Sequence, residues 1–190
     1  MLKVKRTTDI DTDSFRVGDI IQFKLTDGED IEAMAVKQES DGMLFCMVDC
    51  LTGECSMNDT NTNEGGYEGS ELRKKLNAEI IDRFPVNIKA LMIPFWNGDY
   101  LCLPTEREIF GENYYGEYES PYVEQWEPMK QRRNRIAFQG KNGCLEWYWL
   151  QNKCIKSTAA FAYVDDGGDA GCSGASRSLG VRPVFKIKNG

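Results

Sequence analysis

The run Gly180-Val181-Arg182-Pro183-Val184-Phe185-Lys186-Ile187 predicts the strand that closes the fold. Apolar residues dominate this run, and a short apolar run of this length is typical of a core strand. Arg182 interrupts it, and a buried guanidinium must find hydrogen-bond acceptors. We therefore expect Arg182 to pin the closing strand, over residues 181–187, to a loop.

Two more core strands are predicted upstream of the closing run. Residues 145–150 are apolar and aromatic, and residues 161–164 form a second short apolar run. Residues 165–180 are mostly small or polar, and we predict a loop there. A loop this long within a compact domain is usually functional or disordered. Its acidic stretch, residues 165–169, lacks the spacing and terminal glutamate of an EF-hand, so we predict a tight turn without calcium.

The N-terminal part of the chain predicts a small antiparallel meander. Its residues alternate in a strand-like way, and Asp27-Gly28 is a hairpin turn signal. We predict two domains: residues 1–49 form the meander, which packs on a ligand-binding domain of residues 50–190. The three predicted strands cover residues 17–25, 31–36 and 43–48.

A first main helix is predicted to begin at Ser70, where a serine cap precedes the acidic Glu71. Pro85 ends it, and a short helix or turn follows over residues 87–91. Apolar residues at helical spacing form its buried stripe. That stripe consists of Leu72, Leu76, Ile80 and Ile81.

A second main helix is predicted from Thr105, which precedes Glu108 in the capping-box position. Residues 100–103 predict a short strand before it. Residues 111–131 are rich in Tyr, Glu and Gly and predict a long aromatic loop after it. The mixture of antiparallel strands and two main helices gives an α+β fold class.

Charge and composition exclude several functions. The chain of 190 residues has a net charge of −7, so it repels phosphate backbones and nucleic acid is a poor partner. Without histidine there is no Ser-His-Asp triad, Cys-His pair or His-ligated metal. No carboxylate or lysine pair is isolated as catalytic, and we expect no cofactor, no metal and no enzymatic activity. The basic cluster, which we expect on a solvated face, is Lys130, Arg132, Arg133 and Arg135.

The cysteines and the apolar runs predict the compartment in which the protein is found. Seven cysteines are an odd number, and residues 1–6 lack the apolar core of a signal peptide. We therefore expect reduced thiols and a protein in the cytoplasm or on a phage virion. No apolar run reaches membrane-spanning length, so no membrane insertion is expected.

Three spaced elements stand out together. They are residues 65–77, which contain Ser70-Glu71-Leu72-Arg73-Lys74-Lys75-Leu76-Asn77, residues 103–111, and Trp147-Tyr148-Trp149-Leu150 followed by Gly180-Val181-Arg182-Pro183. Together these elements resemble an uncharacterised family of gut Firmicutes and their prophages, which is related to the C-type-lectin-like fold of formylglycine-generating enzymes. The resemblance implies that fold, with a twisted antiparallel sheet, but not the oxidase activity. Two features depart from it: Gln151-Asn152 stands where the family has Arg-Ser, and the copper-binding cysteine pair of the enzymes has no counterpart.

The segment after Leu150 is also similar to the variable region of proteins diversified by retroelements. Such systems mutate template adenines, so an asparagine codon AAY becomes any NNY codon, and NNY cannot encode Lys, Gln, Glu, Met or Trp. The 26 residues 157–182 contain none of these five types, which make up 46 of the 190 residues. A turn-rich loop of small residues also excludes these types, so this alternative stays open.

We expect a ligand-recognition protein with a hypervariable surface, an unknown protein or carbohydrate ligand and possible homo-oligomerisation. One alternative is a formylglycine-generating-type enzyme that uses Cys154 and Cys172. Another is a structural phage or prophage protein without ligand binding. The candidate variable contact residues are Cys154, Ile155, Ala160, Asp165, Asp166, Gly168, Asp169, Gly171, Cys172, Ser173, Gly174, Ser176, Arg177, Ser178 and Leu179.

Overall fold

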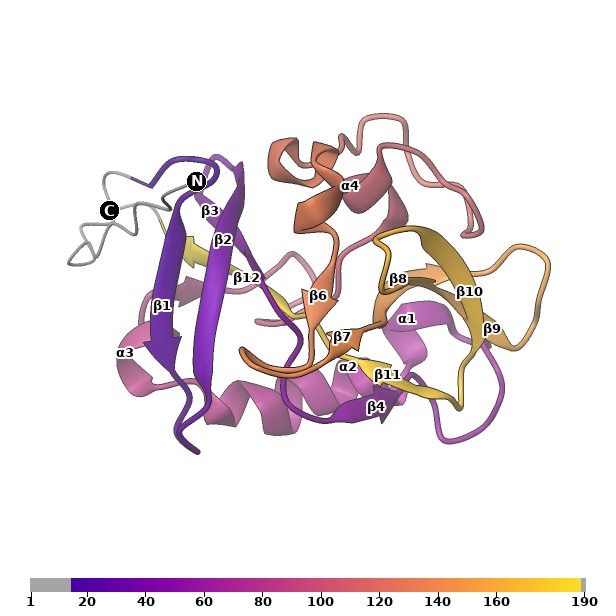
Figure 1. Ribbon diagram of the computed structural model, residues 1–190, viewed down its shortest axis with the longest axis horizontal. Helices are drawn as coiled ribbons and strands as arrows, with labels where there is room; N and C mark the ends of the chain where they lie inside the picture. Colours follow the sequence, from indigo (N-terminus) through magenta and orange to yellow (C-terminus); the bar gives the residue numbers. More distant parts are fainter. Residues whose placement is uncertain (1–14, 189–190) are drawn as a thin grey trace.

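The computed structural model of the protein describes residues 15–188 and has an α+β architecture of mostly antiparallel sheets and few helices (Figure 1). The first sheet has the order β1 (Ile20–Lys24), β2 (Asp30–Gln38), β3 (Gly42–Met47), β12 (Val184–Lys188), β5 (Met92–Ile93). The second sheet has the order β10 (Ala170–Gly174), β9 (Ala160–Val164), β8 (Tyr148–Lys153), β11 (Ser178–Gly180), β4 (Glu54–Ser56). A two-stranded sheet joins β6 (Ala137–Phe138) and β7 (Leu145–Glu146).

The predicted meander is confirmed as β1, β2 and β3, which pair in sequence order. The closing strand β12 then pairs with β3, and Phe185 lies opposite Phe45. The meander and the end of the chain therefore share one sheet and one hydrophobic cluster. The predicted boundary between two domains at residue 49 remains a prediction. Residues 1–14, which include the start without an apolar signal core, lie outside the described part of the chain.

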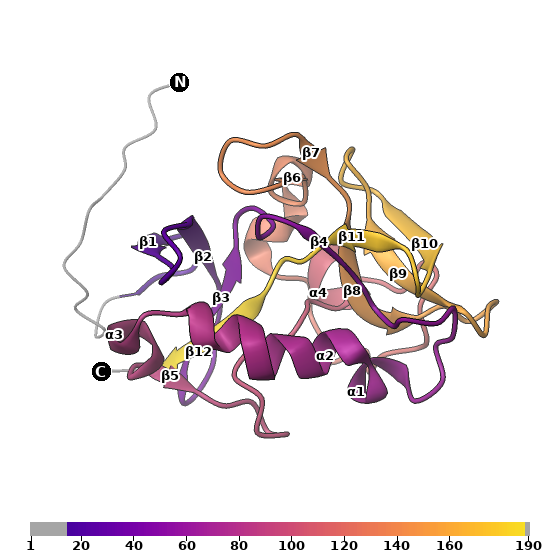
Figure 2. The ribbon, with the colours of Figure 1, turned by 90° about the horizontal axis from the view of Figure 1, so that it is seen from below.

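The first predicted helix is confirmed and runs beneath both sheets (Figures 1 and 2). Ser70 caps it, because its side chain accepts the N–H of Arg73 at 3.1 Å. Three of the four predicted stripe residues are buried, while Ile81 is only partly buried. Pro85 follows its last turn as predicted. The helical segments are α1 (Gly66–Gly69), α2 (Glu71–Lys75), η2 (Leu76–Ile80), η3 (Ile81–Arg83) and α3 (Val86–Lys89).

The second predicted helix is confirmed as α4 (Glu106–Phe110), with a complete capping box. Thr105 accepts the N–H of Glu108, and the Glu108 carboxylate accepts the N–H of Thr105 at 2.8 Å. The long aromatic loop follows it, with short 3₁₀ turns at η4 (Glu127–Lys130) and η5 (Arg132–Asn134).

Arg182 pins the closing strand as predicted. Its guanidinium is 1% exposed and donates to the carbonyls of Met47 at 2.7 Å and Asn134 at 3.0 Å. It also donates to the Tyr148 hydroxyl at 2.9 Å and lies over that ring. A single side chain therefore joins the meander, η5 and β8.

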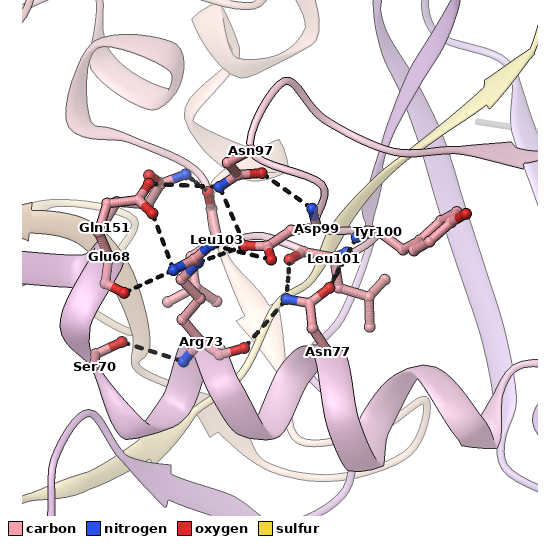
Figure 3. Close-up of polar contacts among 10 residues, drawn as sticks. All are labelled: Glu68, Ser70, Arg73, Asn77, Asn97, Asp99, Tyr100, Leu101, Leu103 and Gln151. Atoms are coloured by element: carbon pink, nitrogen blue, oxygen red, sulfur yellow. Dashed lines mark hydrogen bonds and ion pairs between the residues drawn. The ribbon is translucent and has the colours of Figure 1, made fainter.

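The predicted strand at residues 100–103 is wrong. Only Cys102 forms a bridge there, with Val184. The Asn77 side chain takes the place of a neighbouring strand (Figure 3): its amide donates to the Leu101 carbonyl, and its oxygen accepts the N–H groups of Tyr100 and Leu101. With its backbone groups bonded to a helix side chain, the segment forms no ladder.

Residues 96–99 form a turn. Arg73 on the helix donates to Asp99 at 2.5 Å, and Asn97 donates to the same carboxylate (Figure 3). Gly98 adopts φ 88°, which is readily accessible only to glycine. Trp96, at the start of the turn, is 92% exposed.

The predicted loop at residues 165–180 is wrong in part, because it contains the strands β10 and β11. All five residues of β10 are in register with β9. The residues of β10 are small or polar, so they show no hydrophobic alternation from which a strand could be predicted. The predicted strand over residues 145–150 is also divided, into β7 and β8, at Trp147.

Within residues 15–188, no helix is long and apolar enough to cross a membrane.

Candidate functional site

The candidate segment forms the outer part of the second sheet, where β9 and β10 make an antiparallel hairpin. The hairpin turn is the tight acidic turn predicted from the sequence. The Asp165 carboxylate accepts the N–H groups of Gly167 and Asp169 at 2.9 and 2.8 Å, and Gly168 has φ 79°. Arg132, predicted to lie on a solvated face, is 58% exposed but also bonds this turn, through Asp169 at 2.5 Å.

A disulfide joins Cys154 and Cys172, although the sequence predicts reduced thiols. Cys154 follows β8 and Cys172 lies on β10, so β9 stands between them. Across a flat sheet, two strand spacings would separate them by about 9.5 Å or more. Their Cα atoms are only 6.5 Å apart because the sheet curls, as the bend of β10 shows (Figure 1). Curl is a tertiary property that the spacing of cysteines in sequence does not reveal.

The aromatic loop borders the candidate segment on its other side. The Ile155 N–H donates to the Tyr115 carbonyl at 2.9 Å, and the Glu117 N–H donates to the Lys153 carbonyl at 2.9 Å. Gly116 forms a bridge with Cys154 between them. The segment after β8 is therefore held by the aromatic loop through its backbone and by β10 through the disulfide.

Trp147 and Tyr163 form an aromatic platform that joins the segment before β8 to strand β9 of the hairpin, and the sequence did not predict either residue as part of the site. Their rings stack with centroids 4.9 Å apart and planes 5° from parallel. The Tyr163 ring covers Gly171, where an added Cβ would lie 2.3 Å from the ring carbon Cζ. Partial burial raises the pKa of the Tyr163 phenol, and the nearby Asp165 carboxylate raises it further. Their position in the predicted core strands, residues 145–150 and 161–164, was the available signal.

The fifteen predicted site residues divide by exposure. Five are buried within the protein: Cys154, Ala160, Gly168, Ser173 and Leu179. Three are partly buried: Asp165, Gly171 and Gly174. Seven are exposed and available to a ligand: Ile155, Asp166, Asp169, Cys172, Ser176, Arg177 and Ser178.

The exposed residues do not form a single cluster. Ile155 and Cys172 lie near each other because the disulfide joins Cys172 to the neighbour of Ile155. The acidic turn and residues 176–178 lie at opposite ends of β10, whose five residues span about 17 Å. The surface is therefore an elongated strip rather than a pocket.

The strip has the chemistry of a binding surface. It offers carboxylates, hydroxyls, one guanidinium and the aromatic platform. Among residues 15–188, no group of three or more Cys, Asp or Glu side chains is placed to hold a metal ion. Comparisons with known protein families, with characterised proteins and with solved structures find no match for this chain.

Proposed function

We propose that the chain is a ligand-recognition protein with a C-type-lectin-like fold, whose strip of exposed residues is hypervariable and diversified by a retroelement. One coincidence carries the proposal. The window without Lys, Gln, Glu, Met and Trp, residues 157–182, covers the hairpin and the turns that present six of the seven exposed candidates. On either side of the candidate segment stand Trp149, Leu150, Val181 and Arg182, each at most 1% exposed.

The contacts of the strip support variability. Its backbone is fixed by strand pairing, the disulfide and the Asp165 turn. Within residues 15–188, the side chains of Asp166, Ser176 and Ser178 make no hydrogen bond. Replacing such side chains removes no contact of the fold, so they are free to change with the ligand.

The α+β architecture, the capped helices and the antiparallel sheets agree with the C-type-lectin-like fold that the sequence resemblance implies. The ligand in this proposal is a protein or a carbohydrate. Aromatic platforms and short polar side chains suit both, because rings supply contact area and hydroxyls adapt their hydrogen bonds. The proposal places the protein in the cytoplasm or on a phage virion and gives it no catalytic role.

Sequencing sibling copies of the gene tests this proposal. We expect substitutions to concentrate at the six exposed positions other than Cys172, and to spare the disulfide cysteines and the buried flanks. An adjacent reverse transcriptase gene with an adenine-rich, near-identical repeat should accompany them. Substitutions spread evenly along the chain, or concentrated at Trp149 or Arg182, would refute the proposal.

A second candidate function is supported by the proximity of Cys154 and Cys172, since a formylglycine-generating-type oxidase needs two neighbouring cysteines. Its test is an oxidase assay on a cysteine-containing peptide, with the reduced wild type and the variant C154S/C172S. Activity that disappears in the variant would favour the enzyme. Absence of activity in both, with ligand binding intact, would remove it.

A further inference from the structure

The tyrosine loop, residues 112–124, has a one-sided composition. It contains four tyrosines and four glutamates but no lysine or arginine. Tyr118 is 77% exposed and Tyr122 is 91% exposed. Because an NNY codon cannot encode glutamate, the four glutamate positions of this loop are not positions diversified in that way. On the proposed function, the loop therefore has fixed positions beside a variable surface.

A buried carboxylate holds the first half of the loop. Glu106 on α4 is fully buried, and its carboxylate accepts the N–H groups of Tyr114, Tyr115 and Gly116 at 3.1, 3.1 and 2.8 Å. Asn152 on β8 in turn accepts the N–H of Glu106 at 2.7 Å. Three N–H groups on one anion are strong, charge-assisted hydrogen bonds. They turn the loop backbone inward and leave the tyrosine side chains outside.

Further polar contacts close the loop and hold its second half. Asn113 and Glu119 exchange two hydrogen bonds, at 3.0 and 3.1 Å. Arg107 donates to the carbonyls of Val123 at 2.9 Å and Pro121 at 3.4 Å. The loop therefore has a fixed backbone although it contains no helix or strand of its own.

A fixed loop with exposed tyrosines resembles a built contact surface. Tyrosine rings supply large contact area with few rotatable bonds, and a preformed backbone removes the entropy cost of ordering a loop on binding. Large exposed rings gathered on one segment are also uncommon unless they serve an interaction. These features point to a partner but do not yet specify its chemistry.

Charge specifies the partner. Three of the four glutamates, Glu112, Glu117 and Glu124, are exposed, and the loop has no cation of its own. Glu117 forms an ion pair with Lys153 of β8 at 3.1 Å, at an exposed position where a guanidinium can compete for it. Tyrosine faces attract cations, and a guanidinium also binds carboxylates through paired hydrogen bonds. We propose that the tyrosine loop docks an arginine-rich segment of a partner protein, with Tyr118 and Tyr122 stacking on guanidinium groups and Glu117 and Glu124 binding them.

The test uses the full chain and a fluorescein-labelled nine-residue peptide that alternates arginine and serine, followed by fluorescence anisotropy at 50 mM NaCl. The variant Y118S/Y122S should weaken binding about fivefold, as the loss of two exposed cation–π contacts implies. The matched control W96S removes an equally exposed aromatic ring elsewhere and should change binding less than twofold. Thermal unfolding should be unchanged in both variants, because these side chains are exposed.

A charge comparison separates docking from the general attraction of an acidic chain. E117Q/E124Q should weaken binding and flatten its salt dependence, whereas E64Q/E79Q, which neutralises two exposed glutamates elsewhere, should do neither. No saturable binding, or equal losses in the loop variants and their controls, would overturn the proposal. Tyrosine-dependent binding of neutral oligosaccharides without binding of the arginine peptide would also overturn it.

Discussion

The two five-stranded sheets keep their shape by different means. The first sheet packs large side chains against one another and against the helical layer: the Phe185 ring lies 5.8 Å from Phe45 of β3 and 5.6 Å from Phe84, which follows η3. In the second sheet, the outer strand β10 carries glycine, alanine and serine, and its pairing with β9 and the Cys154–Cys172 disulfide hold it.

On the proposed function, this difference explains how one chain would combine a fixed fold with a variable surface. Stability that depends on side-chain volume makes every buried residue sensitive, because interiors are close-packed. Stability that depends on backbone bonds and a crosslink does not depend on the identity of exposed side chains. We therefore expect large effects of substitution in the first sheet, intermediate effects at the supports of the hairpin, and small effects on the strip.

The largest effect should come from Phe185→Ala. Removal of a fully buried aromatic side chain leaves a cavity and should lower the free energy of unfolding by about 3–5 kcal/mol. Chemical denaturation measures this loss. Val86→Ala, at a position 79% exposed, is the control and should change stability by less than about 0.5 kcal/mol. Similar losses in both variants would contradict the importance of packing in this sheet.

The disulfide should be the next most important support. The variant C154S/C172S should lose about 3 kcal/mol, because the crosslink closes a loop with a sequence separation of 18. The same shift should follow when the wild type is reduced, and reduction should leave the variant unchanged. A wild type that unfolds at the same temperature with and without reductant would show that the hairpin does not depend on this crosslink.

Gly116 connects the tyrosine loop to the second sheet. Gly116→Ala should lower the free energy of unfolding by about 2 kcal/mol. An added Cβ would lie 2.4 Å from Asn152 Cβ and 2.8 Å from Glu106 Oε2, so both supports of the loop must move. Gly69→Ala is the matched control, since its nearest neighbour is 3.9 Å away and its φ is negative. Denaturation curves that coincide for the two variants would mean that the close approach at Gly116 is not a constraint.

A smaller, pH-dependent effect is expected at Glu108 in the capping box of α4. Burial raises the pKa of its carboxyl group to about 7, above its ordinary value of 4.5. A raised folded-state pKa gives stability that is present below about pH 4.5 and is lost as pH rises through 7. Glu108→Gln removes this titration and keeps a capping side chain. As the pH rises from 5 to 9, the free energy of unfolding of the variant should therefore increase by about 1 kcal/mol relative to that of the wild type. A constant difference across this range would contradict the shift.

The sequence predicts the parts of the molecule whose residues carry a period or a cap. Ser70 and Thr105 predict where their helices begin, and the alternation of apolar residues in the meander predicts its strands. The buried role of Arg182 follows from its apolar neighbours. Periodicity could not reveal β10, because its residues are small, nor the disulfide, because it depends on the curl of the sheet. The exposure of each candidate residue also needed the fold, which buries five of the fifteen.

The central claim is that the strip varies without loss of the fold and thereby changes its ligand. Its most direct test is an NNY-codon library at Ile155, Asp166, Asp169, Ser176, Arg177 and Ser178, compared with a matched library at the buried positions Ala160, Gly168, Ser173 and Leu179. Most members of the first library should stay folded, and selection against a panel of proteins and oligosaccharides should yield binders that the parent lacks. Most members of the second should unfold. Widespread unfolding in the first library, or no binder among its folded members, would contradict the account.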